Sequence, residues 1–214
     1  MIWYVIPARK GSKGLHYKNR LLFGATAETV WSVHKDVIVT TDDEVLINRA
    51  NEYEFRVRIR PHEFAQDNTA IKTVLHDVIN YYEMKPDDII VLLYLTYPER
   101  TWLDICNGLN FFYRTKAKSM LCKKDWQYVH PCLCMWDMGN NKGKQLFYHN
   151  YYRRQDYPKV FEVSHFLAIF KICEFNKLNN QLYNDDTVFM PVDNKIDVDT
   201  LDDYNRYMEI EQCR

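Results

Sequence analysis

The 214-residue sequence lacks long apolar runs, and no stretch approaches the roughly 18 to 20 residues that a membrane-spanning helix needs. Met1 leads directly into a short strand-like segment, without a basic start or a cleavage site, so we expect no signal peptide. The net charge is only −1, which excludes the positive excess typical of general nucleic-acid binding. We therefore expect a cytoplasmic protein with neither a membrane nor a nucleic acid as partner.

The six cysteines lack the patterns of a disulfide framework or a zinc finger. Disulfide frameworks belong to short secreted chains, and this chain is long and shows no secretion signal. Cys132 and Cys134 form a Cys-x-Cys pair with only His130 nearby, and no second pair stands at zinc-finger spacing. Ordinary reduced thiols are therefore favoured over a zinc site.

Acidic residues are missing from the first 27 positions, where a basic loop, Pro7–Asn19, follows the strand-like segment Ile2–Ile6. Small residues let a backbone approach a ligand closely, and the long cationic side chains can close over an anion. The spacing of Gly11 and Gly14 fits neither a Walker loop nor a GxGxxG loop. The loop by itself therefore leaves two interpretations open, a phosphate-binding cradle and a solvated basic surface.

Strand-like and helix-like segments alternate through the first half of the chain. Expected strands are 2–6, 36–41, 55–59 and 89–95, and expected helices are 44–52, 69–84 and 102–113. This alternation predicts a three-layer α/β fold with a mostly parallel sheet. We expect residues 1–214 to form a single domain.

The pattern changes after residue 115. Further strands are expected at 119–122, 128–135, 166–172 and 195–199, with a turn-rich loop at 137–144 and a helix starting at Thr200. Residues from about 125 to 165 are expected to form a β-rich excursion that serves dimerisation or acceptor binding.

Ligands of parallel α/β sheets bind at the carboxyl ends of the strands. The basic loop and the segments Thr40–Asp43 and Thr96–Arg100 all follow expected strands, so they should converge at one edge. This convergence favours the phosphate-binding interpretation.

Asp197 and Asp199 alternate with apolar residues at the period of a strand, so their carboxylates should share one face. Two neighbouring carboxylates repel each other, and a cation between them relieves the repulsion; Mg²⁺ prefers such oxygen ligands and suits a phosphate substrate. The alternative is an exposed strand end that merely precedes a helix cap.

Six motifs, in order, resemble those of the acylneuraminate cytidylyltransferase family, the CMP-sialic acid synthetases. They are Pro7–Gly14 with Lys18-Asn19, Val39–Asp43, Arg60–Asp67, Leu95–Arg100, Arg153–Asp156 and Ile196–Thr200. The resemblance implies a nucleotidyltransferase (glycosyltransferase-A-like) fold, a homodimer, and Mg²⁺ as cofactor. It implies transfer of CMP from CTP to the anomeric hydroxyl of a 2-keto sugar acid, with release of pyrophosphate.

The resemblance also implies roles for individual residues. Those expected to bind the nucleotide are Ala8, Arg9, Gly11, Ser12, Lys18 and Arg60. The implied catalytic group is Arg9, Lys18, Asn19 and Asp199, and the implied metal ligands are Asp197 and Asp199. The sugar acid would be held by Tyr94, Arg154 and Gln155, the last two at a dimer interface.

Three departures from the family pattern affect the expectations. The segment between the loop and the second strand is short, and Glu28–His34 leaves room for only about two helical turns. Tyr94 and Tyr97 replace the family's Gln and Ser, and Ser164-His165 replaces Asn-Gly. Because these positions belong to the acceptor side, two alternatives stay open: another acidic sugar such as 3-deoxy-octulosonate, or a nucleotide-binding homologue with weak turnover.

Overall fold

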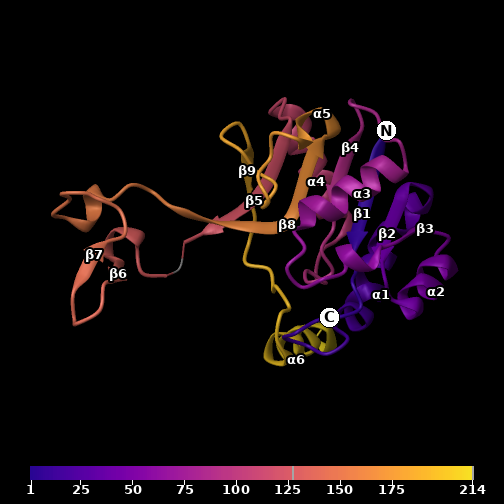
Figure 1. Ribbon diagram of the computed structural model, residues 1–214, viewed down its shortest axis with the longest axis horizontal. Helices are drawn as coiled ribbons and strands as arrows, with labels where there is room; N and C mark the ends of the chain where they lie inside the picture. Colours follow the sequence, from indigo (N-terminus) through magenta and orange to yellow (C-terminus); the bar gives the residue numbers. More distant parts are fainter. Residues whose placement is uncertain (127, 214) are drawn as a thin grey trace.

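A seven-stranded sheet, in the order β3-β2-β1-β4-β8-β5-β9, forms the centre of the computed structural model (Figure 1). The structure describes residues 1–126 and 128–213. The strands are β1 Ile2–Pro7, β2 Val37–Thr41, β3 Arg56–Ile59, β4 Ile89–Leu92, β5 Ser119–Asp125, β8 Phe161–Lys171 and β9 Val188–Pro191. β1 to β4 are mutually parallel, β8 is antiparallel to both β4 and β5, and β9 is parallel to β5. The prediction of a mostly parallel sheet is confirmed.

Helices cover both faces of the sheet. They are α1 Lys18–Val30, α2 Glu44–Glu52, α3 Ile71–Tyr81, α4 Trp102–Arg114, α5 Ile172–Phe175 and α6 Leu201–Gln212. Short 3₁₀ turns lie at η1 Trp31–Asp36, η2 His62–Phe64, η3 Pro131–Leu133 and η4 Arg154–Asp156. Alternate residues of β1 point to opposite faces, so Tyr4 packs in the core under α1, α2, α4 and α6, and Val5 in the core under α3 and α5. The three-layer prediction is confirmed.

Helix starts follow recognisable capping signals at three places. Asp43 caps α2 by accepting a hydrogen bond from the Val45 N–H at 3.0 Å. Thr101 and Thr200 form capping boxes at α4 and α6 with the aspartates three positions later.

Three expected elements were wrong. The helix after the basic loop begins at Lys18 and runs to Val30, so it is much longer than two turns and supports the loop directly. No strand forms over 195–199, although Val198 is buried and its N–H donates to the Thr96 carbonyl at 2.8 Å. Segment 128–135 contains the 3₁₀ turn η3 instead of a strand, because Pro131 supplies no N–H to a ladder.

Residues 128–160, here named the arm, extend away from the sheet (Figure 1). The arm holds a small two-stranded sheet of β6 Met135–Asp137 and β7 Gly143–Gln145, joined by the turn-rich loop. Its side chains include uncovered aromatic rings: Tyr148 and Tyr152 are each 96% exposed and Trp136 is 57% exposed. Within the described part of the chain, no helix is both long and apolar enough to cross a membrane.

Candidate functional site

A cavity of about 230 Å³ opens at the carboxyl edge of β1 and β4. Its walls include six of the residues predicted to bind or act on the nucleotide: Arg9, Gly11, Ser12, Lys18, Asn19 and Arg60. Tyr94 and Thr96 close it on the β4 side, and the start of α3 closes it opposite. The expected convergence of the basic loop with the end of β4 therefore exists.

The base of the basic loop is tied to β2 and to its own helix. The Ala8 N–H donates to the Thr40 carbonyl at 2.9 Å, and the Ala8 carbonyl accepts from the Thr41 hydroxyl at 2.5 Å. The Asn19 side chain donates to the Arg9 carbonyl at 2.8 Å. Because Ala8 has both backbone groups engaged, it holds the strand end in place, and Asn19 shapes the turn that follows.

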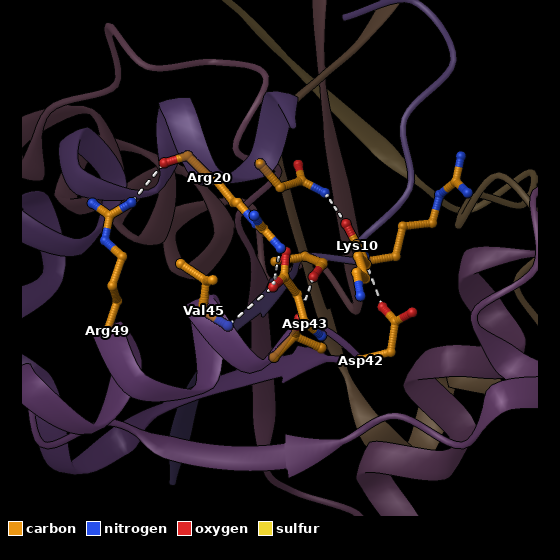
Figure 2. Close-up of polar contacts among 10 residues, drawn as sticks. Lys10, Arg20, Asp42, Asp43, Val45 and Arg49 are labelled. Carbon is orange, nitrogen blue, oxygen red and sulfur yellow. Dashed lines mark hydrogen bonds and ion pairs between the residues drawn. The ribbon is translucent and has the colours of Figure 1, made fainter. Parts of the chain in front are cut away.

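An ion pair between Arg20 and Asp43 anchors α1 to α2 beside the loop (Figure 2). Arg20 donates to both carboxylate oxygens, at 2.7 and 2.9 Å, and Arg49 donates to the Arg20 carbonyl at 2.6 Å. Burial by itself would raise the pKa of Asp43, but the hydrogen bonds from Arg20 and Val45 hold it below its usual value. Next to this pair, the Lys10 N–H donates to Asp42 at 2.7 Å (Figure 2). The loop therefore stands on a rigid, charge-paired base.

Two cationic side chains of the basic loop, Arg9 and Lys13, form ion pairs with an aspartate of the same chain. Asp67, from the segment before α3, forms ion pairs with Arg9 and with Lys13, the latter at 2.7 Å. Lys13 and Arg9 hold the pKa of Asp67 below its usual value, so the carboxyl is ionised at neutral pH. An anion that enters the cradle must therefore compete with Asp67 for these two side chains.

Lys18 and Asp199 meet although they lie 181 positions apart in the sequence. The Lys18 ammonium donates to Asp199 Oδ1 at 2.6 Å, at the first turn of α1. A backbone contact supports this meeting, because a Cβ atom on Gly14 would lie only 2.3 Å from the Asp199 carbonyl oxygen. Figure 1 shows the matching arrangement, with α6 beside the indigo loop that follows β1.

Asp197 is held by a tyrosine. The Tyr97 hydroxyl donates to Asp197 Oδ2 at 2.8 Å, and the Tyr97 ring is buried. Asp197 and Asp199 are both exposed and flank the buried Val198, and residues 195–199 form no strand ladder.

The donor set of this pair fits a magnesium ion. Tyr97 binds Oδ2 of Asp197 and Lys18 binds Oδ1 of Asp199, so the other oxygen of each carboxylate lies outside these two bonds. Mg²⁺ is commonly bound by one or two carboxylates, with waters and substrate phosphates as its other ligands. Over residues 1–126 and 128–213, no group of three or more His, Cys, Asp or Glu side chains is arranged to hold a metal. The nucleotide would therefore have to complete the coordination.

Arg60 lies under the cavity as a buried cation. Its guanidinium donates to the Thr40 carbonyl at 2.9 Å, and burial lowers its pKa to about 10. Arg60 is therefore charged at neutral pH, and its fixed position suits recognition of a polar planar group.

The residues expected on the acceptor side have bulky side chains. The rings of Tyr94 and His165 meet edge to face at 5.8 Å, and His165 also contacts the Gln181 carbonyl at 3.3 Å. Behind them, the buried Arg100 donates to the Phe166 and Tyr94 carbonyls at 2.9 and 3.0 Å. These contacts link β8 to the end of β4.

Arg154 and Gln155 are not brought to this cavity within one chain. Both belong to η4 and are exposed, and the corresponding orange part of the ribbon lies in the arm (Figure 1). Tyr94, the other residue predicted to bind the acceptor, lines the cavity.

Four residues of the site escaped the sequence-based assignment of roles. Tyr97 departs from the family pattern, and no local signal indicates its bond to Asp197, which joins positions 100 apart. Asp67 and Arg100 end two of the six motifs, and the resemblance implies no role for either. Gly14 could have been found from the matched signature, since a glycine there signals a close backbone approach.

Relatives of the chain are found among curated N-acylneuraminate cytidylyltransferases. The chain is 27% identical over 222 residues to a curated N-acylneuraminate cytidylyltransferase of Streptococcus agalactiae serotype V, an alignment that covers 94% of this chain and 51% of the relative. The chain thus spans about half the length of that relative. No protein-family model matches the chain.

Solved structures share the fold over nearly the whole chain. A CMP:2-keto-3-deoxy-manno-octonic acid synthetase complexed with CTP superposes with a TM-score of 0.68 at 14% identity, covering 99% of this chain and 98% of that one. A cytidylyltransferase of Leptospira borgpetersenii serovar Hardjo-bovis gives a TM-score of 0.60 at 16% identity, covering 100% of this chain and 87% of that one. The chain is thus similar in sequence to a curated N-acylneuraminate cytidylyltransferase and has the nucleotidyltransferase-like α/β fold of cytidylyltransferases.

Proposed function

We propose that this chain is a Mg²⁺-dependent cytidylyltransferase that transfers CMP from CTP to the anomeric hydroxyl of an acidic 2-keto sugar. The observation that carries the proposal is the meeting of Lys18 with Asp199 beside the basic loop. This contact unites a phosphate-binding cradle with a carboxylate pair, the two parts that nucleotidyl transfer requires. The curated relative and the CTP-complexed neighbour support the same chemistry.

The reaction is an in-line displacement at the α-phosphorus. The hydroxyl oxygen of the sugar forms a bond to phosphorus, the bond to the β-phosphate oxygen breaks, and the hydroxyl proton leaves to water. Arg9, Lys18 and the N–H groups near Gly11 and Ser12 hold the triphosphate, and Arg60 contacts the base. Asn19 keeps the turn at the α-phosphate in shape through its bond to the Arg9 carbonyl. Catalysis is mostly positioning and charge neutralisation, so no covalent nucleophile is needed.

A bound Mg²⁺ would neutralise charge on the phosphates, and Asp197 and Asp199 would hold it. Lys18 leaves Asp199 when it turns to the triphosphate, because a flexible ammonium can exchange one anionic partner for another. Its side chain is mostly covered, whereas that of Asp199 is 66% exposed, so the carboxylate is accessible to the incoming ion.

Pyrophosphate release tests the proposal directly. Purified chain is given CTP, Mg²⁺ and a panel that includes sialic acid and 3-deoxy-octulosonate, and pyrophosphate is measured by a coupled assay. Release with sialic acid supports the leading proposal. Release only with 3-deoxy-octulosonate identifies the second acceptor, which the structural neighbour favours. CTP binding without pyrophosphate release with any acceptor would contradict the proposed enzymatic activity. It would support the alternative, a nucleotide-binding homologue with weak turnover.

The proposal includes a homodimer formed through the arm. Exposed aromatic rings are enriched at protein interfaces, and the arm also carries an apolar groove of about 380 Å³ lined in part by Pro131, Phe147 and Tyr151. A second copy that covers this surface could bring Arg154 and Gln155 to the cavity of its neighbour. A cytoplasmic location completes the proposal, supported by six cysteines that form no disulfide.

Subunit mixing tests whether Arg154 acts across the dimer. Arg154→Ala and Asp199→Asn are prepared as separate inactive variants, then unfolded and refolded together in equal amounts. If Arg154 serves the neighbouring site, half the dimers are mixed and each has one intact site, so about one quarter of wild-type activity returns. No recovery contradicts the shared site, provided that wild type refolds with full activity.

A further inference from the structure

Tyr97 has a fixed place beside the carboxylate pair. Its side chain is 6% exposed, and its ring meets Phe166 edge to face at 5.6 Å. The Arg100 guanidinium lies 5.8 Å from the ring centroid and is itself anchored on the Phe166 and Tyr94 carbonyls. The hydroxyl that donates to Asp197 therefore cannot turn away without disturbing the core.

The hydrogen-bond partners of the two carboxylates differ in flexibility. Lys18, on Asp199, has a flexible stem and is predicted to turn to the triphosphate. Tyr97, on Asp197, is rigid and buried, so it keeps Oδ2 occupied whether or not a nucleotide is bound. Asp197 therefore offers mainly its other oxygen, Oδ1, to a cation.

The number of oxygens that a carboxylate offers separates magnesium from calcium. Mg²⁺ demands a compact octahedral shell and takes carboxylates through one oxygen, whereas Ca²⁺ accepts more ligands and often takes both oxygens. Hydrogen bonds to the non-ligating oxygen orient a carboxylate and tune metal affinity.

We propose that Tyr97 is a positioning residue that restricts Asp197 to one-oxygen binding and thereby makes the carboxylate pair prefer Mg²⁺ to Ca²⁺. This inference rests on the proposed function, because it concerns the metal that the transfer needs. It also gives a role to the tyrosine that stands where the resembled family has serine.

The test measures metal selectivity in the absence of turnover. The full chain with CTP and no acceptor is titrated with Mn²⁺, followed by electron paramagnetic resonance, and Mg²⁺ or Ca²⁺ is then used to displace the Mn²⁺. In Tyr97→Phe, the ring stays but the hydroxyl is lost. We expect the Mg²⁺ dissociation constant to rise about tenfold while that of Ca²⁺ changes less than about threefold.

Tyr4→Phe is the matched control, since Tyr4 is also a buried tyrosine and lies in β1. An unchanged Mg²⁺-to-Ca²⁺ ratio in Tyr97→Phe, an equal fall of the ratio in Tyr4→Phe, or absence of Mn²⁺ binding in wild type would each overturn the inference. Pyrophosphate release by wild type is measured separately, so the proposed activity can stand while this inference fails.

Discussion

The basic loop with its cations, here named the cradle, differs from the arm in whether its exposed side chains have partners within the chain. In the cradle, Arg9, Lys13 and Lys18 all have carboxylate partners from the same chain. In the arm, rings such as Tyr148 and Tyr152 are almost fully uncovered. Ion pairs at a surface are weak and exchangeable, whereas uncovered apolar area favours a lasting partner. This difference fits the roles proposed for the two regions, a cradle for a ligand that comes and goes and an arm for association between subunits.

Removal of the Asp199 carboxylate should have the largest effect on the proposed activity. We expect Asp199→Asn to abolish Mg²⁺-dependent pyrophosphate release, a loss of at least about 10³-fold, because the metal loses a charged ligand while the side chain keeps its shape. The thermal midpoint should stay within about 2 °C of wild type, since the side chain is exposed. Asp202→Asn, an exposed aspartate in α6, is the matched control. Undiminished activity in Asp199→Asn would refute the metal assignment.

Removal of exposed aromatic rings from the arm should weaken the proposed dimer. We expect Trp136→Ser combined with Tyr148→Ser to raise the dimer dissociation constant about 100-fold or more, because aromatic side chains dominate interface energies. Sedimentation velocity over a concentration series measures the change. Tyr113→Ser, on an exposed position of α4 outside the arm, should leave the dimer intact. A wild type that is monomeric at every concentration would eliminate the dimer.

Loss of the ion pair between Arg20 and Asp43, at the base of the cradle, should lower the stability of the fold. We expect Asp43→Ala to lower the free energy of unfolding by about 3 kcal/mol, because it removes the cap of α2 and leaves Arg20 unpaired. The thermal midpoint, measured by calorimetry, should then fall by roughly 6 to 12 °C. Glu44→Ala, which keeps the cap and the ion pair, should change it by far less.

The same pair predicts how stability depends on pH. The folded-state pKa of Asp43 lies below its unfolded value, which is about 3.9, so the pair stabilises the fold fully above that pH. The contribution is lost as the pH falls through the folded pKa. Asp43→Ala should therefore lose less stability than wild type between pH 5 and 2, as measured by urea unfolding. Parallel curves for the two proteins would show that the pair does not set the acid limit.

Removal of the Asp67 charge, which pairs with Arg9 and Lys13, should have the smallest effect. We expect Asp67→Asn to tighten CTP binding about two- to fivefold, because the triphosphate no longer competes with a carboxylate for Arg9 and Lys13. Isothermal titration calorimetry measures the affinity, with Glu63→Gln, an exposed neighbour in η2, as control. Weaker binding in Asp67→Asn would mean that Asp67 contacts the nucleotide or its metal.

The sequence was sufficient for elements with strong local signals. The buried positions of α3 follow from the helical spacing of Val74, Leu75 and Val78, and the start of α4 follows from its capping box. The start of α1 was missed because its N-cap, Tyr17, has a left-handed backbone and provides no side-chain cap. Segment 195–199 was mistaken for a strand because alternation predicts which side chains are buried, but does not predict whether a neighbouring strand is available for pairing.

The candidate site was predictable where one segment carries the chemistry. The basic loop and the alternation of Asp197 and Asp199 are visible locally, whereas the bonds of Tyr97 to Asp197 and of Lys18 to Asp199 join distant positions. Such contacts depend on how the end of the chain packs on the edge of β4. Arg154 and Gln155 lie outside the cavity because the arm carries them away from it, and no local pattern in the sequence reports that distance.

The close approach of Gly14 to Asp199 has a consequence for biosynthesis. The contact joins the first loop of the chain to a segment that the ribosome makes much later, since Lys18 and Asp199 are separated by 181 positions. At about 5 to 20 residues per second, roughly ten to forty seconds pass between the two events. A nascent chain can therefore form its first strands and its basic loop early, but it cannot form the contacts of Asp199 with Gly14 and Lys18 until translation has passed Asp199.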